Sequence, residues 1–326
     1  MAEAAGVDVE LFIRSLLGGF FQGDTVRQLV QQSREVFFAE SERLFREGQA
    51  SQFIYFIIDG TVALEREGSD AWTFGPGDVV GVLDADVGAA HHRTATAYSD
   101  VHAFALQLRD WEDIQEDDFD LVRLRLIANA RNLLHTGLRL APSCGFDGTG
   151  AAQPPREASQ LSVEPELNAF GRLLALRVTP AFRLAGTQAL LELAHEAKEL
   201  RATAGETLFE EGDEASAIYL VVAGDVGFER REPEVRARFA STQLVGGYMG
   251  FGQECQPATA RAVTEVVVVV IQLEHLFEVM EDHFDLARAM LSFMALERIR
   301  VQEQAPPVAA IYEIAGGAAR RERRGA

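Results

Sequence analysis

Two patterns of hydrophobic and polar positions alternate along the chain, and their order, helical then strand-like then helical, occurs twice. Apolar residues recur at helical spacing over residues 7–36 and again over residues 111–140. Between them, over residues 37–108, short β-branched and aromatic runs are separated by Gly, Asp and Ser. Apolar residues three and four apart predict amphipathic helices, and short runs between turn residues predict strands. We therefore expect two short helices, an antiparallel β-barrel or sandwich, and a closing helix.

Particular segments of the β-rich interval carry this prediction. The segment 75–78, Gly-Pro-Gly-Asp, predicts a tight turn, because proline fixes φ and glycine accepts positive φ. Four runs predict strands, at residues 53–58, 62–64, 72–74 and 103–108.

The same order begins again at residue 166. A helix is predicted at residues 188–200, and strand-like runs follow over residues 208–273. A Leu-, Met- and Phe-rich pattern with intervals of three and four predicts a closing helix over residues 274–304.

The two halves align residue by residue. Phe45 corresponds to Phe209 and Tyr55 to Tyr219, at a constant offset of 164 residues. Self-similarity held without a gap over some twenty residues marks a duplicated structural unit. The chain is therefore expected to contain two copies of one module.

These patterns define the expected domain organisation. We expect domain 1 at residues 7–140 and domain 2 at residues 166–304, which agrees with roughly 150 residues per domain. Residues 141–165 are rich in Pro, Gly, Ser and Ala and predict a linker. Residues 305–326 contain four arginines near their end and predict a disordered tail. That cluster could contact an acidic partner, but a solvated tail is the more common explanation.

Composition narrows the function classes. The formal net charge of −20 creates a field that repels phosphate backbones, so no nucleic-acid partner is expected. Cys144 and Cys255 show no C-x-x-C spacing, which fits a reducing compartment. The N-terminus lacks the layout of a secretory signal, and the longest apolar run, residues 266–271, is far shorter than the ~18 residues of a membrane span. We therefore expect a cytoplasmic protein without a membrane span.

The order of elements and one repeated motif resemble a known family. Residues 209–213, Phe-Glu-Glu-Gly-Asp, precede Ile218-Tyr219 and then Gly224-Asp225-Val226. This arrangement resembles the cyclic-nucleotide-binding domain, the module of the catabolite activator protein and of protein kinase A regulatory subunits. The resemblance implies a mainly β fold with flanking α-helices. It would consist of two jelly-roll β-barrels of the double-stranded β-helix type, each with N- and C-terminal helices.

In that family the ligand binds a cassette of the form F-G-E-x-A-L, a short loop, and R-[ST]-A-T. Backbone N–H groups and the arginine hold the cyclic phosphate, and the glutamate accepts a hydrogen bond from the ribose 2′-hydroxyl. By resemblance, the candidate ligand-binding residues of domain 1 are Gly81, Val82, Leu83, Arg93, Thr94 and Ala95.

One family anchor is missing from this first cassette. Val82 stands at the carboxylate position and cannot accept the ribose hydroxyl, a loss of about 1.5–3 kcal/mol where the missing partner is charged. Asp84 lies two residues later, but that shift turns the side chain by roughly 200° around a helix. Arg93 is therefore either a phosphate clamp or a surface arginine left over from a lost site.

The second cassette has lost both charged anchors. Gly247 stands at the glutamate position and Gln256 at the arginine position. We expect this copy to bind cyclic nucleotide poorly or not at all. By resemblance, its degenerate site comprises Gly246, Gly247, Gln256, Ala258 and Thr259.

The histidines and the cysteine near the two cassettes do not predict a metal or redox site. Adjacent residues of a strand point to opposite faces, so His91 and His92 do not predict a shared metal ion, and a loop is favoured. Cys255 has no basic neighbour in sequence to lower its pKa and is interpreted as structural or incidental. No metal site is expected.

The sequence thus favours a regulatory protein over an enzyme. It contains no catalytic motif, and the roughly twenty residues after residue 304 are too few for a DNA-binding domain, which needs on the order of 60. The leading hypothesis is a non-enzymatic sensor without a permanent cofactor, whose domain 1 binds cyclic AMP, cyclic GMP or another anion. It would signal through its closing helix to an unidentified protein partner. The alternative is an interaction or assembly scaffold with two pockets that no longer bind nucleotide. Homo-oligomerisation through the closing helices suits either hypothesis.

Overall fold

The structure, a computed structural model, describes residues 24–144, 166–231, 235–245 and 251–304. It consists of two compact units, and the division between them falls between Ala128 and Asn129. The domain limits expected from the sequence stay a prediction. Residues 145–165 of the expected linker and the expected tail at 305–326 lie outside the described residues, as do residues 1–23.

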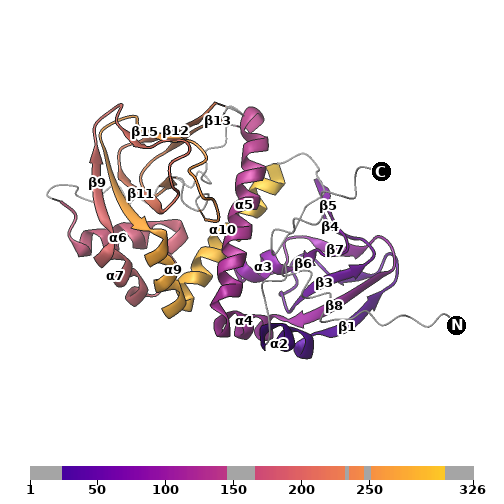
Figure 1. Ribbon diagram of the computed structural model, residues 1–326. Helices are drawn as coiled ribbons and strands as arrows, with labels where there is room; N and C mark the ends of the chain where they lie inside the picture. The colour runs from indigo at the N-terminus through magenta and orange to yellow at the C-terminus, as the bar shows by residue number, and fades with distance from the viewer. Residues whose placement is uncertain (1–23, 145–165, 232–234, 246–250, 305–326) are drawn as a thin grey trace. The chain divides into compact units, whose positions relative to one another are not determined.

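The described part of unit 1 starts with a helix at Asp24, continues with strands interrupted by a short helix, and ends with two helices (Figure 1). Its elements in chain order are α2 (Asp24–Gln32), β1 (Arg34–Phe38), β2 (Arg43–Phe45), β3 (Phe53–Asp59), β4 (Val62–Arg66), β5 (Ser69–Phe74), β6 (Val79–Val80), α3 (Val82–Val87), β7 (Thr94–Ala97), β8 (Val101–Gln107), α4 (Leu108–Asp117) and the first part of α5 (Phe119–Cys144).

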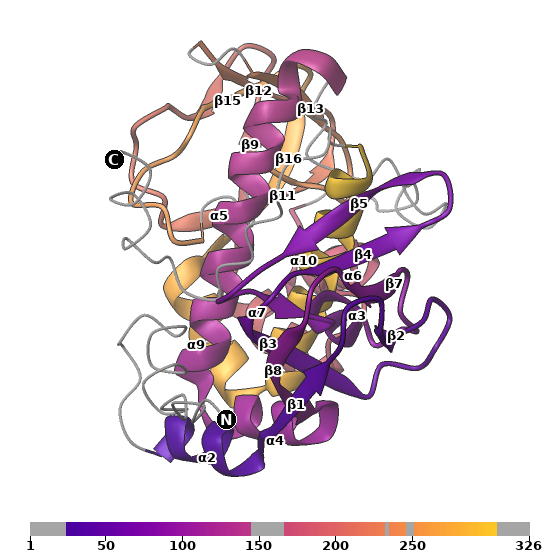
Figure 2. The ribbon, with the colours of Figure 1, turned by 90° about the vertical axis from the view of Figure 1, so that its right-hand side faces the viewer.

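These strands form two antiparallel sheets. One has the order β1-β8-β3-β6 and the other β2-β7-β4-β5, and Figure 2 shows both sets of strands. Turn 75–78 joins them as the sequence predicts: Asp78 N donates to Gly75 O at 3.0 Å, and Gly77 has φ of 88°.

Unit 2 repeats the order of strands and closing helices, and residues 246–250, at the place equivalent to the start of α3, lie outside the described residues. Its elements are the rest of α5, then α6 (Ala169–Val178), the 3-10 helix η2 (Pro180–Phe182), α7 (Thr187–Glu196), β9 (Lys198–Ala202), β10 (Thr207–Phe209), β11 (Ala217–Ala223), β12 (Val226–Arg230), β13 (Val235–Phe239), β14 (Leu244–Val245), β15 (Thr259–Ala262), β16 (Val266–Gln272), α9 (Leu273–Asp282) and α10 (Phe284–Gln304).

The sheets of the two units have the same topology. Unit 2 contains the orders β9-β16-β11-β14 and β10-β15-β12-β13, strand for strand those of unit 1. Single hydrogen bonds repeat as well. The amide of Glu47 donates to Thr94 Oγ1 at 3.1 Å, and the amide of Glu211 donates to Thr259 Oγ1 at 3.0 Å. The predicted duplication and the predicted mainly β fold with flanking helices are confirmed.

Two predicted helix boundaries are wrong. Residues 34–36, included in the first helical pattern, belong to β1, and residues 198–200, predicted as the end of a helix, belong to β9. Each segment pairs along its whole length with the long central strand of its sheet, as in Val36 opposite Ala103 and Leu200 opposite Val268. Cross-strand pairing outweighs the local apolar spacing.

Each predicted closing helix is in fact two helices. The break in unit 1 lies at Asp118, whose φ of −134° and ψ of 92° are extended rather than helical. The break in unit 2 lies at the equivalent His283, with φ of −132° and ψ of 83°. The other residues predicted for these two closing helices are helical, and α4 begins three residues earlier than expected, at Leu108. Of the two short helices predicted over residues 7–36, α2 is described, and residues 7–23 lie outside the described residues.

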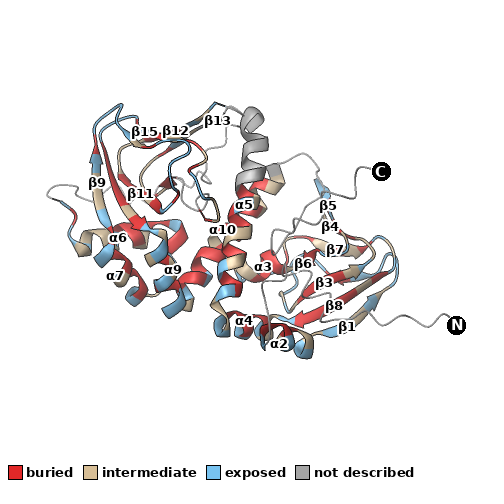
Figure 3. Ribbon diagram, viewed as in Figure 1, coloured by how far each residue is buried: buried red, intermediate tan, exposed pale blue. Residues whose placement is uncertain are grey.

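The core of unit 1 lies between its sheets and its helices (Figure 3). Trp111 of α4 is 1% exposed and meets Phe56 of β3 edge to face, with ring centroids 6.3 Å apart. Val26 and Leu29 of α2 join the same cluster. Helices α2 and α4 are thereby fixed to the sheet by buried apolar contact, which is worth about 25 cal/mol per Å².

Candidate functional site

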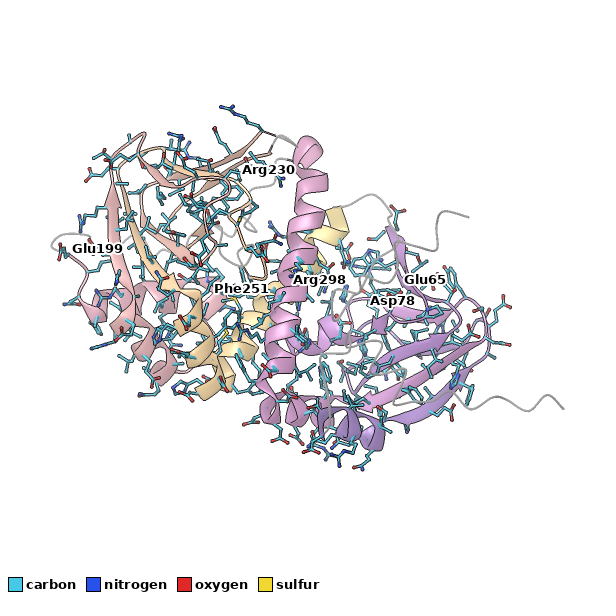
Figure 4. The ribbon with its side chains drawn as sticks, in the orientation of Figure 1. Glu65, Asp78, Glu199, Arg230, Phe251 and Arg298 are labelled. Atoms are coloured by element: carbon cyan, nitrogen blue, oxygen red, sulfur yellow. The ribbon has the colours of Figure 1, made fainter. Side chains whose placement is uncertain are left out.

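The cassette of unit 1 begins where β6 ends. Gly81 has φ of 90°, and a Cβ there would lie 3.1 Å from Phe53 O, so glycine suits both the backbone conformation and the space. Helix α3 follows and ends at Gly88, which has φ of 70°. Asp78 precedes this segment and accepts a hydrogen bond from Gly75 N at 2.7 Å (Figure 4). The backbone is therefore fixed both before and after α3, by turn 75–78 and by Gly88.

Val82, at the position of the family's carboxylate, is packed into the hydrophobic core. It is 7% exposed and lies in the same cluster as Trp111 and Phe104. Its neighbour Leu83 is 5% exposed. These two positions of α3 contribute apolar contact.

Arg93 is buried, so the interpretation as a surface arginine is wrong. Its side chain is 1% exposed, and Nη1 donates to Leu64 O at 3.2 Å and to Asp70 O at 2.6 Å. The guanidinium also lies 4.0 Å from the centroid of the Trp72 ring, within range for a cation–π interaction. The guanidinium of Arg93 is thus held by Leu64 of β4 and by Asp70 and Trp72 of β5.

The next two candidates hold strands together. Thr94 Oγ1 accepts the hydrogen bond from Glu47 N, and Ala95 is fully buried opposite Leu64 in the β4–β7 pair. Gly81, Val82 and Leu83 thus line one cavity with Trp72, the residue that covers Arg93. Arg93 and Thr94 are already engaged in contacts within the chain, and Ala95 is buried in the β4–β7 pair.

Asp84 and two histidines form a cluster that the sequence did not predict. His91 Nδ1 lies 3.0 Å from Asp84 Oδ2, and His92 Nδ1 is hydrogen-bonded to Asp84 Oδ1. Asp84 is 5% exposed. Burial alone would raise its pKa, but the hydrogen bonds and charges of His91 and His92 outweigh burial, so the pKa of Asp84 lies below its usual value.

The sequence prediction for the histidine pair was correct in one respect. His91 and His92 lie in a loop, as expected, but both side chains meet the same carboxylate. Sequence reasoning rejected a shared contact because it applied strand geometry, in which neighbouring side chains diverge. Spacings of seven and eight residues would share a face of a continuous helix, but α3 ends at Gly88 and both histidines lie in the loop after it, so helical spacing could not have indicated the cluster.

The space left at this site is small. A cavity of about 10 Å³ remains, lined by Asp84 and His92 together with apolar side chains. Such a cavity holds about one water molecule, whereas pockets for small-molecule ligands measure about 300–1,000 Å³. The other lining residues are Leu64, Trp72, Phe74, Val79, Gly81, Val82 and Leu83.

Trp72 is the functional candidate that sequence reasoning missed. It was predicted only as a strand residue, yet it covers the guanidinium of Arg93 and lies 5.3 Å from the ring of His92. This position depends on the register of the β4–β5 hairpin, in which Leu64 pairs with Trp72. No local sequence signal gives that register.

The second cassette is described in part. Gly246 and Gly247 lie outside the described residues. Gln256, at the arginine position, is 2% exposed, and its backbone amide donates to Asp213 O at 2.7 Å. Its Oε1 is buried without a hydrogen-bond partner in the described structure. Ala258 is 1% exposed, and Thr259 accepts a hydrogen bond from Glu211 N.

The residues after the gap also pack inward. Phe251 is fully buried, with its ring 5.4 Å from that of Phe277 on α9 (Figure 4). Cys255, the neighbour of Gln256, is exposed and carries a free thiol. In the described part of this cassette, Gln256 offers a neutral amide where the family has a cation.

Within the described ranges, no three His, Cys, Asp or Glu side chains are arranged to hold a metal ion. None of the helices in the described part of the chain combines the length and hydrophobicity that crossing a bilayer requires.

Comparison with known proteins places this geometry in a family. The family model of the cyclic nucleotide-binding domain matches residues 35–118 and 199–283. A comparison with curated proteins finds no match.

Solved structures similar to the chain are distant. A regulatory subunit of a cAMP-independent protein kinase A from Trypanosoma brucei has 16% identity over 92% of this chain and 91% of its own, with a TM-score of 0.33. The regulatory domain of Toxoplasma gondii PKA, crystallised with cAMP, has 14% identity over 90% and 95%, with a TM-score of 0.33.

A third structure covers a single domain. The N-terminal domain of a transcriptional regulator from Streptomyces coelicolor has 28% identity over 41% of this chain and 98% of its own, with a TM-score of 0.36. Because the two segments matched by the family model together span more than half of the sequence, this chain belongs to the cyclic nucleotide-binding domain family.

Proposed function

We propose that this chain is a non-enzymatic regulatory protein that keeps the tandem family fold but acts without binding a cyclic nucleotide. Of the two hypotheses from the sequence, the site geometry favours the interaction or assembly scaffold over the sensor. Its partner would be another protein or a further copy of this chain, and we expect it to act in the cytoplasm.

The position of Arg93 carries the proposal. A phosphate clamp needs a guanidinium that can reach an anionic oxygen. Here the guanidinium is 1% exposed, bonded to two backbone carbonyl oxygens and covered by Trp72 at 4.0 Å. A cyclic phosphate could reach it only after Trp72 or the arginine side chain moved. If that movement withdrew Nη1 from Leu64 O, the buried carbonyl left unpaired would cost about 1–3 kcal/mol.

The rest of the site supports the same conclusion. Val82 cannot supply the ribose acceptor because it is an apolar core residue. In the described structure, the cavity beside Asp84 and His92 has a volume of about 10 Å³, far smaller than a nucleotide. In unit 2, Gln256 replaces the cation altogether. Neither cassette therefore offers the pair of charged anchors that the family uses.

Calorimetry on the full chain tests the proposal. Cyclic AMP and cyclic GMP, each titrated to about 1 mM, are expected to give no saturable heat with wild type. The matched variants are Arg93→Ala, which removes the buried cation, and Arg66→Ala, which removes an exposed arginine of the same sheet. Saturable heat that is kept in Arg66→Ala and lost in Arg93→Ala would overturn the proposal in favour of the sensor. Saturable heat kept in both variants would overturn it by showing a site elsewhere.

One observation favours the sensor as the second candidate. Arg93 and Thr94 occupy the positions of the family's phosphate-binding pair in unit 1, and the first turn of α3 has no side-chain cap. A ligand could use these groups only if the pocket first opened. The same titration separates the two functions.

A further inference from the structure

We propose that Asp84 is a positioning residue that fixes His91 and His92, when neutral, as Nδ1–H tautomers, so that His92 presents a hydrogen-bond acceptor to the unit 1 pocket, where a phosphate site needs donors. The part of this proposal that concerns phosphate rests on the proposed function. The part that concerns the tautomers depends only on the hydrogen bonds of Asp84.

The tautomers follow from the hydrogen-bond partners. An ionised carboxylate only accepts hydrogen bonds, so a ring nitrogen bonded to it must carry the proton. His91 Nδ1 and His92 Nδ1 are both bonded to Asp84, one to each oxygen. In a neutral imidazole, the nitrogen that is not protonated is an acceptor. Both histidines, when neutral, therefore have an unprotonated Nε2.

Ring packing holds both imidazoles in this orientation. The His91 ring stacks on Phe45, with centroids 3.6 Å apart and an interplanar angle of 10°. The His92 ring lies 5.3 Å from Trp72. Rotation of either ring to offer its other nitrogen would break these contacts. The cluster therefore ties α3 to the loop that carries both histidines.

The other charged groups around α3 are already paired. Asp86, on the same helix, is bound by Arg125 of α5. Arg93 donates to Leu64 O and Asp70 O. Tyr55 of β3, the strand packed against α3, has its pKa raised by burial and stays an uncharged phenol. His91 and His92 are therefore the side chains that stabilise the charge on Asp84.

The consequence for the pocket is specific. His92 lines the cavity, and its Nε2 is buried without a hydrogen-bond partner in the described structure. That atom presents a lone pair, which repels the oxygen of a phosphate and accepts a bond from a donor. A cavity of about 10 Å³ admits one water molecule, which is such a donor. With His92 neutral, the site thus favours a water-sized hydrogen-bond donor and disfavours oxyanions.

Nitrogen-15 NMR of histidine-labelled full-length protein tests the assignment. Correlations between ring nitrogens and ring protons at about pH 9, where free imidazole is neutral, show which nitrogen carries the proton. The variants His91→Gln and His92→Gln assign the signals. We expect Nδ1–H for both residues in wild type. His102 bonds Glu35 through Nε2 at 2.6 Å, so it should show the opposite tautomer in the same spectrum. Nε2–H signals for His91 and His92 would overturn the proposal.

The variant Asp84→Ala tests the role of the carboxylate. Both histidines should lose the Nδ1–H signature, and amide hydrogen exchange should rise over residues 89–93. The matched control Asp70→Asn changes an exposed carboxylate of β5 and should leave both readouts unchanged. Unchanged tautomers in a folded Asp84→Ala protein would overturn the proposal. If that variant does not fold, the wild-type spectrum alone decides. If the nucleotide titration gives no heat, the NMR spectrum can still show the wrong tautomers. The two proposals are therefore tested by independent measurements.

Discussion

Arg125 of α5 holds Asp86 of α3 through two hydrogen bonds from Nη2, 2.6 Å to Oδ1 and 2.5 Å to Oδ2. The two side chains are 4% and 6% exposed. The guanidinium also donates to Gln115 Oε1 and lies 5.0 Å from the Trp111 ring centroid. A buried ion pair with further partners thus joins the cassette helix of unit 1 to the helices that follow the sheets.

Breaking this pair should destabilise unit 1 strongly. Arg125→Met leaves the carboxylate of Asp86 buried without its cation, which costs about 3–5 kcal/mol. Both tryptophans of the chain, Trp72 and Trp111, lie in unit 1, so urea unfolding followed by tryptophan fluorescence reports on that unit alone.

The double variant Asp86→Leu/Arg125→Met is the internal control. It removes both charges and should recover most of the lost stability, because the pair itself contributes little beyond compensating its own burial. Arg27→Met, which breaks the exposed pair with Asp24, should cost less than about 1 kcal/mol. A loss below 1 kcal/mol in Arg125→Met would show that this ion pair is not buried in solution.

Arg93 should matter for stability even without ligand. Arg93→Ala removes the donor to Leu64 O and Asp70 O and the contact with Trp72, so unit 1 should lose at least about 1–3 kcal/mol. Arg66→Ala, at an exposed position, should fall within about 0.5 kcal/mol of wild type. Thermal unfolding followed by fluorescence measures both. Equal stability of the two variants would mean that Arg93 is not held as described.

Asp84 makes the stability of unit 1 depend on pH in the acid range. Its pKa in the folded protein is lower than its usual value of 3.8, because hydrogen bonds from the histidines outweigh burial. The unfolded chain therefore binds the proton first, and stability falls as the pH drops from the unfolded pKa through the folded one. In Asp84→Asn this part of the decline should disappear. A fluorescence-detected stability profile between pH 5 and pH 2 compares the two proteins, and identical slopes would contradict the assignment.

The glycines of the hairpins allow a comparison within one unit. Gly60 has φ of 89°, and a Cβ there would lie 2.2 Å from Asp100 O, whereas Gly48 has φ of 78° and open space around it. Gly48→Ala should lower the free energy of unfolding by about 1–2 kcal/mol, because alanine disfavours the left-handed conformation. Gly60→Ala should cost more, since the backbone must also move. Fluorescence-detected urea unfolding ranks them, and the reverse order would show that the close approach to Asp100 is absent.

The duplication and the sheet fold could be predicted because short-range patterns in the sequence indicate both. The gapless match that aligns Phe45 with Phe209 survives as identical strand orders in both units. Helix ends were predicted less well, because β1 and β9 are defined by partners about seventy residues away in the sequence. Local spacing holds no information on those partners.

The sequence predicted which residues form the site, but it did not predict which side chains they contact. The sequence placed Arg93 in the cassette and identified Val82 as an incompatible replacement, but it could not show that Trp72 covers the guanidinium. It also treated Asp84 as a weak substitute for the missing carboxylate, whereas Asp84 binds the two histidines. Both contacts depend on the register of strands and on a loop conformation, which three-dimensional packing decides.

The central claim is that the residues of the unit 1 cassette satisfy one another and leave no room for a cyclic nucleotide. A ligand that binds only the folded state raises the stability of that state. The most direct test is therefore the thermal midpoint of unit 1, followed by tryptophan fluorescence on the full chain, with and without 5 mM cyclic AMP or cyclic GMP, and with 5 mM sodium phosphate as the ionic control. The account predicts the same midpoint under all conditions. A midpoint raised by several degrees by either nucleotide, but not by phosphate, would contradict it.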